Sequence, residues 1–405
     1  MKLAVIVTEF PKTTETFILR DMMVWHEAGV DLRLYHLGAW NHAEILHDFA
    51  APLAKVARHV PLARAVTLAG AVRHLPVVAA RGGTILRHQS REPALAGKSL
   101  ALLPAGIGMG RDLADWGADH IHAEFAGHPA TAAWIAHRVT GIPYSISCRA
   151  HDIFRSQRLL EQKFREAAAI RTVSDFARDF LRRTVPGAAH RPIEVIHSSV
   201  DVAAIPAPPY TRNPDQFRIL YTGSLTAKKG VPVLLDALAG FDRPGWQLDL
   251  AGDGPDRATL EQQVARLGLK DRVRFLGQQQ FDALTSLYAR ADVCVAPSII
   301  GPGGRAEGIP NVMIEALAYG RPAISTRISG IPELIRDGQT GWLVPPADAT
   351  ALRAALCAVH DDPDEAARRA AAGRRLVEQE FDVRKNAMRQ LALFEAASGQ
   401  RGVAA

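Results

Sequence analysis

Short apolar segments alternate with longer amphipathic segments along the whole chain, and this alternation limits the folds that the chain can adopt. The apolar segments have the length and composition of buried strands, and the amphipathic segments have helical spacing. The clearest predicted strands are KLAVIVT, VDLRLYHL, ADHIHAEF and IPYSISC in the first half, and FRILYTG, WQLDLAG, RVRFLG and DVCVAPS in the second. Such alternation predicts an α/β fold, in which helices cover both faces of parallel sheets.

The length of the chain predicts two domains, because 405 residues exceed what one compact core usually holds. Residues 201–216, DVAAIPAPPYTRNPDQ, contain four prolines and no apolar periodicity, which makes them the predicted linker. We therefore predict two doubly wound, Rossmann-like domains, 1–200 and 201–385, with ligand in a central cleft. Residues 386–405 include a predicted amphipathic helix.

Composition excludes several classes of protein. Hydrophobic residues make up 48% of the chain and charged residues 22%, as in ordinary globular proteins. No apolar run approaches the roughly 18 residues that span a bilayer, and no signal-peptide cleavage site follows the start. The three cysteines, Cys148, Cys294 and Cys357, are too far apart for a metal cluster or a disulfide framework. These features predict a cytoplasmic protein without a metal site.

One basic stretch holds most of the excess positive charge. Between Lys55 and Arg111, nine Lys and Arg residues face a single acid, Glu92. One interpretation is a set of solvated helix faces, and the other is a surface that attracts anionic lipid headgroups or a lipid-diphosphate acceptor. Nucleic acid is not predicted as a partner, because aromatic residues for base stacking are missing from this stretch.

The segment AEGIPNVMIEALAYGRP, residues 306–322, holds the most specific chemical pattern. Glu307 and Glu315 stand on either side of a Gly-Ile-Pro-Asn turn that opens a short helix, with Asn311 as the predicted N-cap. Backbone N–H groups at a helix start attract anions. The pattern favours a ligand with both phosphate and hydroxyl groups, such as a nucleotide-sugar. The predicted donor-binding residues of this turn are Gly308, Ile309, Pro310, Asn311, Val312 and Glu315.

This segment resembles the donor-site signature of retaining GT-B glycosyltransferases of family 4 (GT4), with its E-x7-E motif. The resemblance continues through SGIPELIRDGQTGWLVPPAD and, at the N-terminus, through TEFPKTTETFILRDM, which is similar to exopolysaccharide and colanic-acid-type enzymes. It implies two Rossmann-like domains, with the segment 386–405 crossing back to the first domain.

The resemblance implies roles for further residues. Lys229 in GSLTAKKG matches the lysine that grips the donor diphosphate, whereas Ser224 occupies the position where the family usually has arginine. His151 in CRAHDIF matches a histidine that contacts the donor sugar, and the adjacent Asp152 orients it or binds acceptor hydroxyls. The predicted catalytic residues are therefore Glu307, His151 and Lys229. Lys12, Thr13 and Glu15, after the first strand, are weaker candidates for acceptor contacts.

The implied activity is metal-independent, retaining transfer of a sugar from a nucleotide-diphosphate sugar to a glycan or polyprenyl-diphosphate-linked acceptor. No cofactor is implied beyond the donor itself, and GIGMG at 106–110 lacks the strand and glycine spacing of a dinucleotide site. A peripheral position at the inner face of the cytoplasmic membrane is implied by the basic stretch. Two alternatives stay open: a nucleotide-sugar 2-epimerase-like enzyme, and a non-catalytic nucleotide-sugar-binding subunit, which the loss of arginine at Ser224 would suit.

Overall fold

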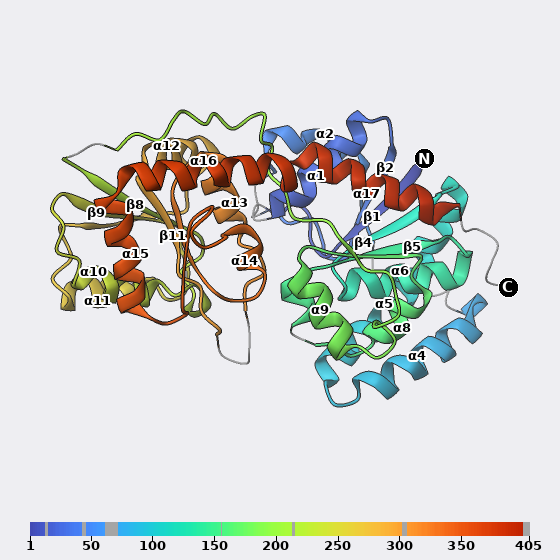
Figure 1. Ribbon diagram of the computed structural model, residues 1–405. Coiled ribbons are helices and arrows are strands. Elements are labelled where there is room, and N and C mark those ends of the chain that lie inside the picture. Colours follow the sequence, from blue (N-terminus) through green and yellow to red (C-terminus); the bar gives the residue numbers. More distant parts are fainter. Residues whose placement is uncertain are drawn as a thin grey trace. The chain divides into compact units, whose positions relative to one another are not determined.

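The computed structural model describes residues 1–12, 15–42, 46–60, 72–154, 156–212, 215–301 and 306–399, without the side chains of His151 and Phe281. It divides into two compact units (Figure 1). Unit 1 consists of Met1–His197 with Val383–Ala405, and unit 2 consists of Ser198–Asp382. Each unit has its own parallel sheet and its own cores, so the predicted α/β class with two doubly wound sheets is confirmed.

The sheet of unit 1 has seven parallel strands in the order β3-β2-β1-β4-β5-β6-β7. The strands are β1 (Lys2–Val7), β2 (Asp31–His36), β3 (Ala57–His59), β4 (His120–Glu124), β5 (Tyr144–Cys148), β6 (Ala169–Thr172) and β7 (Glu194–Val195). Strand order reverses between β1 and β4, where Leu3 pairs with His120. At such a reversal the loops after the two strands diverge and leave space for a ligand at the carboxyl edge.

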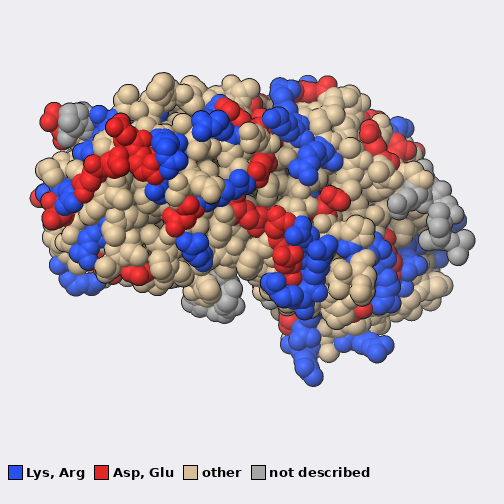
Figure 2. Space-filling view, in the orientation of Figure 1, with Lys and Arg blue, Asp and Glu red and all other residues tan. Residues whose placement is uncertain are grey.

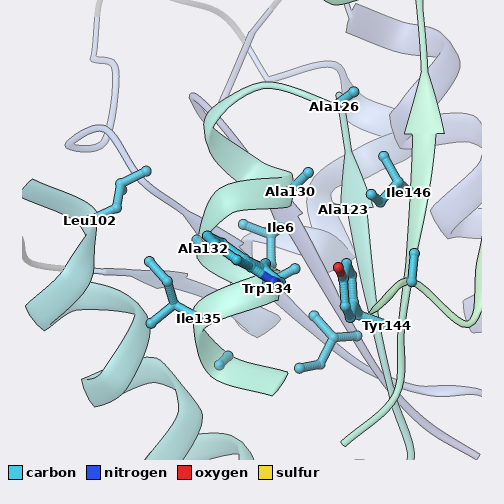
Figure 3. Packing of buried hydrophobic residues seen from close by; sticks show 14 of the residues in the cluster. Ile6, Leu102, Ala123, Ala126, Ala130, Ala132, Trp134, Ile135, Tyr144 and Ile146 are labelled. Carbon is cyan, nitrogen blue, oxygen red and sulfur yellow. The ribbon is translucent and has the colours of Figure 1, made fainter. Parts of the chain in front are cut away.

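Helices cover both faces of this sheet. They are α1 (Thr16–Glu27), η2 (Asp48–Ala50), α2 (Ala51–Val56), α4 (Leu75–Gln89), α5 (Pro93–Trp116), α6 (His128–Thr140), α7 (Ala150–Ile153), α8 (Leu160–Glu166), α9 (Asp175–Thr184) and α17 (Val383–Ser398). On one face α6 places Trp134 and Ile135 in an apolar cluster with Ile6 and Tyr144 (Figure 3). No helix among the described residues is long and apolar enough to cross a membrane.

The GIGMG segment lies inside α5 and serves packing there. A Cβ atom on Gly106 would lie 2.8 Å from Cγ2 of Ile135, a distance that real Cβ contacts do not show. Gly106 therefore allows α5 and α6 to approach closely. Its position in the middle of a helix agrees with the expectation that it does not form a dinucleotide-binding loop.

On the other face α17 packs beside α1. The indole Nε1 of Trp25 donates a hydrogen bond to the backbone oxygen of Ala387 at 2.8 Å. Phe394 is fully buried, and its ring lies 4.4 Å from the imidazole of His122 between centroids. The C-terminal helix is thus part of the core of unit 1.

A buried polar layer lies beneath α17. Arg171 of β6 donates to Oε1 of Gln390 at 2.6 Å, and Gln390 donates to Oδ2 of Asp21 at 2.9 Å. His122 of β4 bonds to Ser145 and Ser147 of β5 at 2.7 and 3.1 Å. Because buried polar groups must be paired, these hydrogen bonds fix the position of α17 on the sheet.

Asp21 makes the stability of unit 1 depend on pH. Burial raises the pKa of Asp21 to about 6 from an ordinary value of 3.8, although the charge of Arg171 opposes the shift. Protonation of Asp21 therefore stabilises the fold at low pH, and this contribution is lost as pH rises through about 6. The side chain in Asp21→Asn is neutral at every pH, so the variant does not lose this contribution. Between about pH 4 and 7 we expect the free energy of unfolding of wild type to fall, relative to that of the variant, by up to about 3 kcal/mol. Urea unfolding followed by tryptophan fluorescence measures this difference, and a difference independent of pH would contradict it.

The sheet of unit 2 has six parallel strands in the order β10-β9-β8-β11-β12-β13. The strands are β8 (Phe217–Thr222), β9 (Trp246–Ala251), β10 (Val273–Gly277), β11 (Val293–Ala296), β12 (Ala323–Thr326) and β13 (Trp342–Val344). The helices are η3 (Ala227–Lys229), α10 (Val231–Ala239), α11 (Arg257–Arg266), α12 (Phe281–Arg290), α13 (Asn311–Ala318), α14 (Ile331–Leu334), α15 (Ala349–Asp361) and α16 (Pro363–Glu380). Here strand order reverses between β8 and β11.

The start of the proline-rich segment 201–216, which the sequence predicts as a linker, belongs to unit 2. Val202 and Ile205 are buried in its core. Arg374 of α16 donates to the backbone oxygens of both residues, at 3.1 and 3.2 Å. The described residues 201–212 form no helix or strand. Single apolar side chains and backbone carbonyls hold residues 202–205 in place.

Candidate active site

The most specific sequence motifs meet at the carboxyl edge of the unit 2 sheet. The loop 223–230 follows β8, and the segment 297–310 follows β11, on the two sides of the strand-order reversal. The backbone N–H of Ile299 donates to the oxygen of Lys228 at 2.8 Å, which holds the two segments together. In open α/β sheets this place is the usual ligand site.

Two lysines and one carboxylate form the centre of this site. Lys229 Nζ lies 2.7 Å from Oε2 of Glu307, and Lys228 Nζ lies 3.1 Å from Oε1. Glu307 is 8% exposed. Burial alone would raise its pKa, but the ammonium groups of Lys229 and Lys228 more than offset that effect and lower the pKa below its ordinary value. Glu307 is therefore ionised at neutral pH, and it holds both lysines at the end of β8.

Glycine allows the backbones around the lysines to approach closely. Gly230 has φ +70°, and a Cβ atom there would lie 1.9 Å from the backbone oxygen of Pro297. Gly252, after β9, would likewise place a Cβ atom 1.9 Å from the oxygen of Gly223. Ser224 is exposed in this loop, and its backbone oxygen accepts a bond from the Tyr221 hydroxyl at 2.8 Å. These contacts bring the loop close to the sheet edge.

The turn 308–312 leads into α13, but the prediction that Asn311 caps this helix is wrong. Pro310 occupies the N-cap position in an extended conformation, and Asn311 is the first helical residue. No side chain of the described residues caps the helix start. The proline ring holds Pro310 at φ −68°, so the chain turns into the helix one residue earlier than the polar side chain suggested. The N–H of Met313 donates to the oxygen of Pro310 at 2.9 Å, whereas the N–H groups of Asn311 and Val312 have no partner among the described residues. These two N–H groups are available to a ligand or water.

Glu315 lies one turn inside α13, and residues that the sequence did not indicate orient it. The buried Tyr288 of α12 donates its hydroxyl to Oε2 of Glu315 at 3.0 Å. Thr222, the last residue of β8, lies 2.9 Å from the same hydroxyl. Burial and the charge of Glu315 raise the pKa of Tyr288 well above its ordinary value, so Tyr288 stays a hydrogen-bond donor. A single tyrosine in an amphipathic segment has no pattern that would reveal this role.

In unit 1, acidic and basic groups gather after β1. Lys12 Nζ lies 2.9 Å from a carboxylate oxygen of Glu9 and 3.8 Å from one of Glu15. Burial raises the pKa of Glu15 to about 7, against the opposing charge of Lys12. Thr13 lies outside the described residues. Lys12 and Glu15 thus form one polar cluster, and Glu15 gains a proton near neutral pH.

The segment after β5 holds Arg149 and Asp152. Arg149 pairs with the buried Glu124 at the end of β4, with Nη2 and Oε2 3.2 Å apart. Asp152 accepts from the backbone N–H of Arg149 at 2.8 Å and also from that of Ala126, which ties the starts of two loops together. His151 belongs to the short helix α7, and its side chain lies outside the described residues.

Comparison with known proteins assigns the family of unit 2. Residues 216–362 match the family described as glycosyl transferases group 1. The chain contains a group 1 glycosyltransferase domain. A relative from Escherichia coli K12, WcaL, which is named for colanic acid biosynthesis, is 26% identical over 401 residues, covering 94% of this chain and 96% of that protein. The amylovoran biosynthesis glycosyltransferase AmsK of Erwinia amylovora is 36% identical over 177 residues, covering 43% of each chain.

Comparison with solved structures shows the fold of the whole chain. HepE of Anabaena, crystallised in complex with UDP, matches with a TM-score of 0.73 at 18% identity, covering 98% of this chain and 100% of that one. The fold is therefore that of the GT-B glycosyltransferases, as predicted. The group 1 match confirms the resemblance to glycosyltransferases, and the retaining mechanism stays a prediction.

Proposed function

We propose that the protein is a retaining glycosyltransferase that moves a sugar from a nucleotide-diphosphate donor to a saccharide or lipid-linked acceptor in cell-surface polysaccharide synthesis. The observation that supports this most strongly is the cluster of Lys229, Lys228 and Glu307 beside the uncapped start of α13. The named relatives in colanic acid and amylovoran biosynthesis support the polysaccharide role.

The positive charge of the cluster favours the step in which a nucleoside diphosphate leaves the donor sugar. Lys229 and the backbone N–H groups of 308–312, other than Pro310, which has none, would stabilise the negative charge that develops on the leaving phosphate. Glu307 would bind hydroxyls of the donor sugar and position it, and Glu315 would bind the ribose. Attack on the face that the diphosphate leaves, with that phosphate accepting the proton of the acceptor, preserves the anomeric configuration. No metal ion is needed in this scheme, because Lys229 supplies the cation.

A donor panel tests the proposal. Purified protein is incubated with UDP-, GDP- and ADP-sugars, with and without membrane extract, and nucleotide release is followed for wild type and Glu307→Ala. We expect release from one donor that rises with extract and is lost in the variant, and a product that keeps the donor's anomeric configuration by NMR. Binding of a nucleotide without release from any donor would favour a non-catalytic subunit. Isomerisation of the donor sugar without acceptor would favour an epimerase.

Tyr288→Phe tests the role of Glu315. Loss of the hydroxyl removes the bond that orients the carboxylate, so we expect the donor KM to rise about tenfold with little change in kcat. Tyr319→Phe is a matched control, because its ring stacks on Tyr288 with centroids 5.0 Å apart while its hydroxyl contacts Thr285. Equal effects of the two variants on KM would contradict a specific role for Tyr288.

We propose that the protein also contacts a membrane surface, and the exposed apolar face of α4 supports this. Leu75 and Leu86 lie about three turns apart, hence on one face of the helix, and are 62% and 52% exposed. Ile85 is buried against the core, and the exposed Arg73 and Arg87 flank the apolar face. Figure 2 shows Lys and Arg side chains over the region where α4 and α9 lie in Figure 1. An apolar face rimmed by arginine suits an anionic bilayer surface.

Vesicle sedimentation tests this contact. We expect wild type to bind vesicles that contain phosphatidylglycerol more tightly than pure phosphatidylcholine, and binding to weaken with added salt. Leu75→Asn with Leu86→Asn should weaken binding at least about tenfold, since each leucine loses apolar burial. Met388→Asn, which removes an apolar, 45% exposed side chain from α17, serves as the control. Equal binding of both variants would contradict docking through α4.

A further inference from the structure

A pocket lies at one edge of the unit 2 sheet. The group of Lys229, Lys228 and Glu307, called here the lysine cluster, lies at the opposite edge. It has a volume of about 270 Å³, and its walls include Thr211, Gln216, Arg218, Arg290, Asp292 and Arg321. Arg218 stands at the start of β8, Asp292 directly before β11, and Arg321 shortly before β12. These are the amino ends of parallel strands, whereas the lysine cluster follows their carboxyl ends. A six-residue strand such as β8 separates the two places by roughly 20 Å.

Arg321 is the unusual group in this pocket, because it is a buried cation without an anionic hydrogen-bond partner among the described residues. It is 4% exposed. Its Nε donates to the backbone oxygen of Tyr319 at 3.0 Å, and Nη2 donates to that of Pro208 at 3.2 Å. Burial lowers the pKa of Arg321. Buried charges are normally paired, so a guanidinium held by carbonyls alone can gain from an anion.

The other charged groups leave the pocket positive. Arg218 donates to the neutral side chain of Gln216 at 2.8 Å. Arg290 lies 3.6 Å from Asp249, whose two oxygens already accept bonds from Arg274 at 2.7 and 2.8 Å. Asp292 is the one acidic wall residue, and it accepts the backbone N–H of Arg218 at 2.6 Å. The wall residues thus include three arginines and one carboxylate, and Arg290 also pairs with Asp249 outside the pocket wall.

The Tyr210 hydroxyl adds a second unused group at the same end of the sheet. It is buried and has no hydrogen-bond partner among the described residues. Its ring lies beside Arg321, with the guanidinium carbon 5.9 Å from the ring centroid. The charges of Asp292 and Arg321 both act on this hydroxyl. A donor of this kind next to a buried guanidinium favours an acceptor-rich ligand.

We propose that this pocket binds a small phosphate-bearing anion, separate from the nucleotide-sugar, and that the bound anion stabilises unit 2. Guanidinium groups match the geometry of phosphate oxygens, which accept several charge-assisted bonds at once. The volume is at the small end of ligand pockets, so inorganic phosphate, pyrophosphate or a small phosphomonoester fits the site better than a whole nucleotide-sugar. Occupancy would join the segment 208–211 to the starts of β8, β11 and β12.

Thermal unfolding of the full-length protein tests the site, with phosphate or pyrophosphate titrated against sodium chloride at matched ionic strength. We expect a saturable rise in Tm with both phosphates. Arg290→Ala, at a half-exposed side chain, should weaken the apparent affinity about tenfold, the equivalent of 1.4 kcal/mol. Arg336→Ala, whose 42% exposed side chain pairs with Glu380 away from the pocket, should leave the affinity unchanged.

A second variant separates this site from the donor site. Lys229→Ala removes the cation proposed to bind the donor diphosphate, so the Tm response to phosphate should persist in it. Loss of the response in Lys229→Ala, with Arg290→Ala unaffected, would show that phosphate acts at the donor site and would overturn the proposal. An equal Tm response to chloride at the same ionic strength would also overturn it.

Discussion

Lys229→Ala is expected to lower kcat/KM for the donor by about 10²–10³-fold, a much larger loss than we expect for Lys228→Ala. Lys229 is the more buried of the two lysines, with 17% of its side chain exposed against 37% for Lys228. A cation in a partly dry site stabilises a leaving diphosphate far better than a solvated one. Initial rates of nucleotide release, with the donor identified by the panel, measure the loss.

Lys228→Ala is the matched control for this prediction. Both lysines pair with the same carboxylate, so either variant leaves Glu307 with one remaining cation. Because Lys228 is more exposed, we expect its loss to cost less than about tenfold in kcat/KM. Lys229→Arg should recover part of the activity, since it retains the charge. Equal losses in Lys229→Ala and Lys228→Ala would contradict a specific role for Lys229.

Deletion of residues 383–405 is expected to unfold unit 1. Val383, Leu391 and Phe394 of α17 are all buried, and their removal exposes the sheet face that they cover. Burial of such side chains contributes about 1.5–3 kcal/mol each, so together they approach the whole stability of a typical domain. The deletion also leaves Arg171 and Asp21 without Gln390, which bonds to both.

Deletion of residues 400–405 is the control, because it leaves α17 (Val383–Ser398) whole. We expect this shorter deletion to unfold at the wild-type Tm, and the longer one to give insoluble protein or to lose the transition of unit 1. A full-length Phe394→Ala variant, expected to cost about 3–5 kcal/mol, links the two results to one side chain. An unchanged Tm after the longer deletion would show that unit 1 folds without α17.

The sequence indicated more about unit 2 than about unit 1. Glu307 and Lys229 belong to local motifs in which glycine and proline force a turn, and such motifs can be read without knowing the fold. The structure places these two side chains 2.7 Å apart although they are far apart in the chain. Tyr288 could not be found in this way, because its role depends on where α12 packs and not on its neighbours in sequence.

One local prediction failed because it treated a short segment alone. Asn311 has a side chain that suits an N-cap, but the fixed backbone angle of Pro310 starts the helix one residue earlier. Residues 201–216 were predicted as a linker, and the structure adds that Val202 and Ile205 are buried in the core of unit 2. The composition of a short segment does not show which of its side chains are buried, because burial depends on the rest of the fold.

The sequence by itself determined the α/β class, the two parallel sheets and the pair of motifs at the carboxyl edge of the second sheet. These features follow from strand and helix periodicity and from the backbone limits of glycine and proline, which act over a few residues. Three features could be found only from the tertiary structure. They are the packing of α17 in the core of unit 1, the orientation of Glu315 by Tyr288, and the pocket around Arg321. Each of these joins side chains from distant segments, and their partners are chosen by packing and by the need to pair buried polar groups.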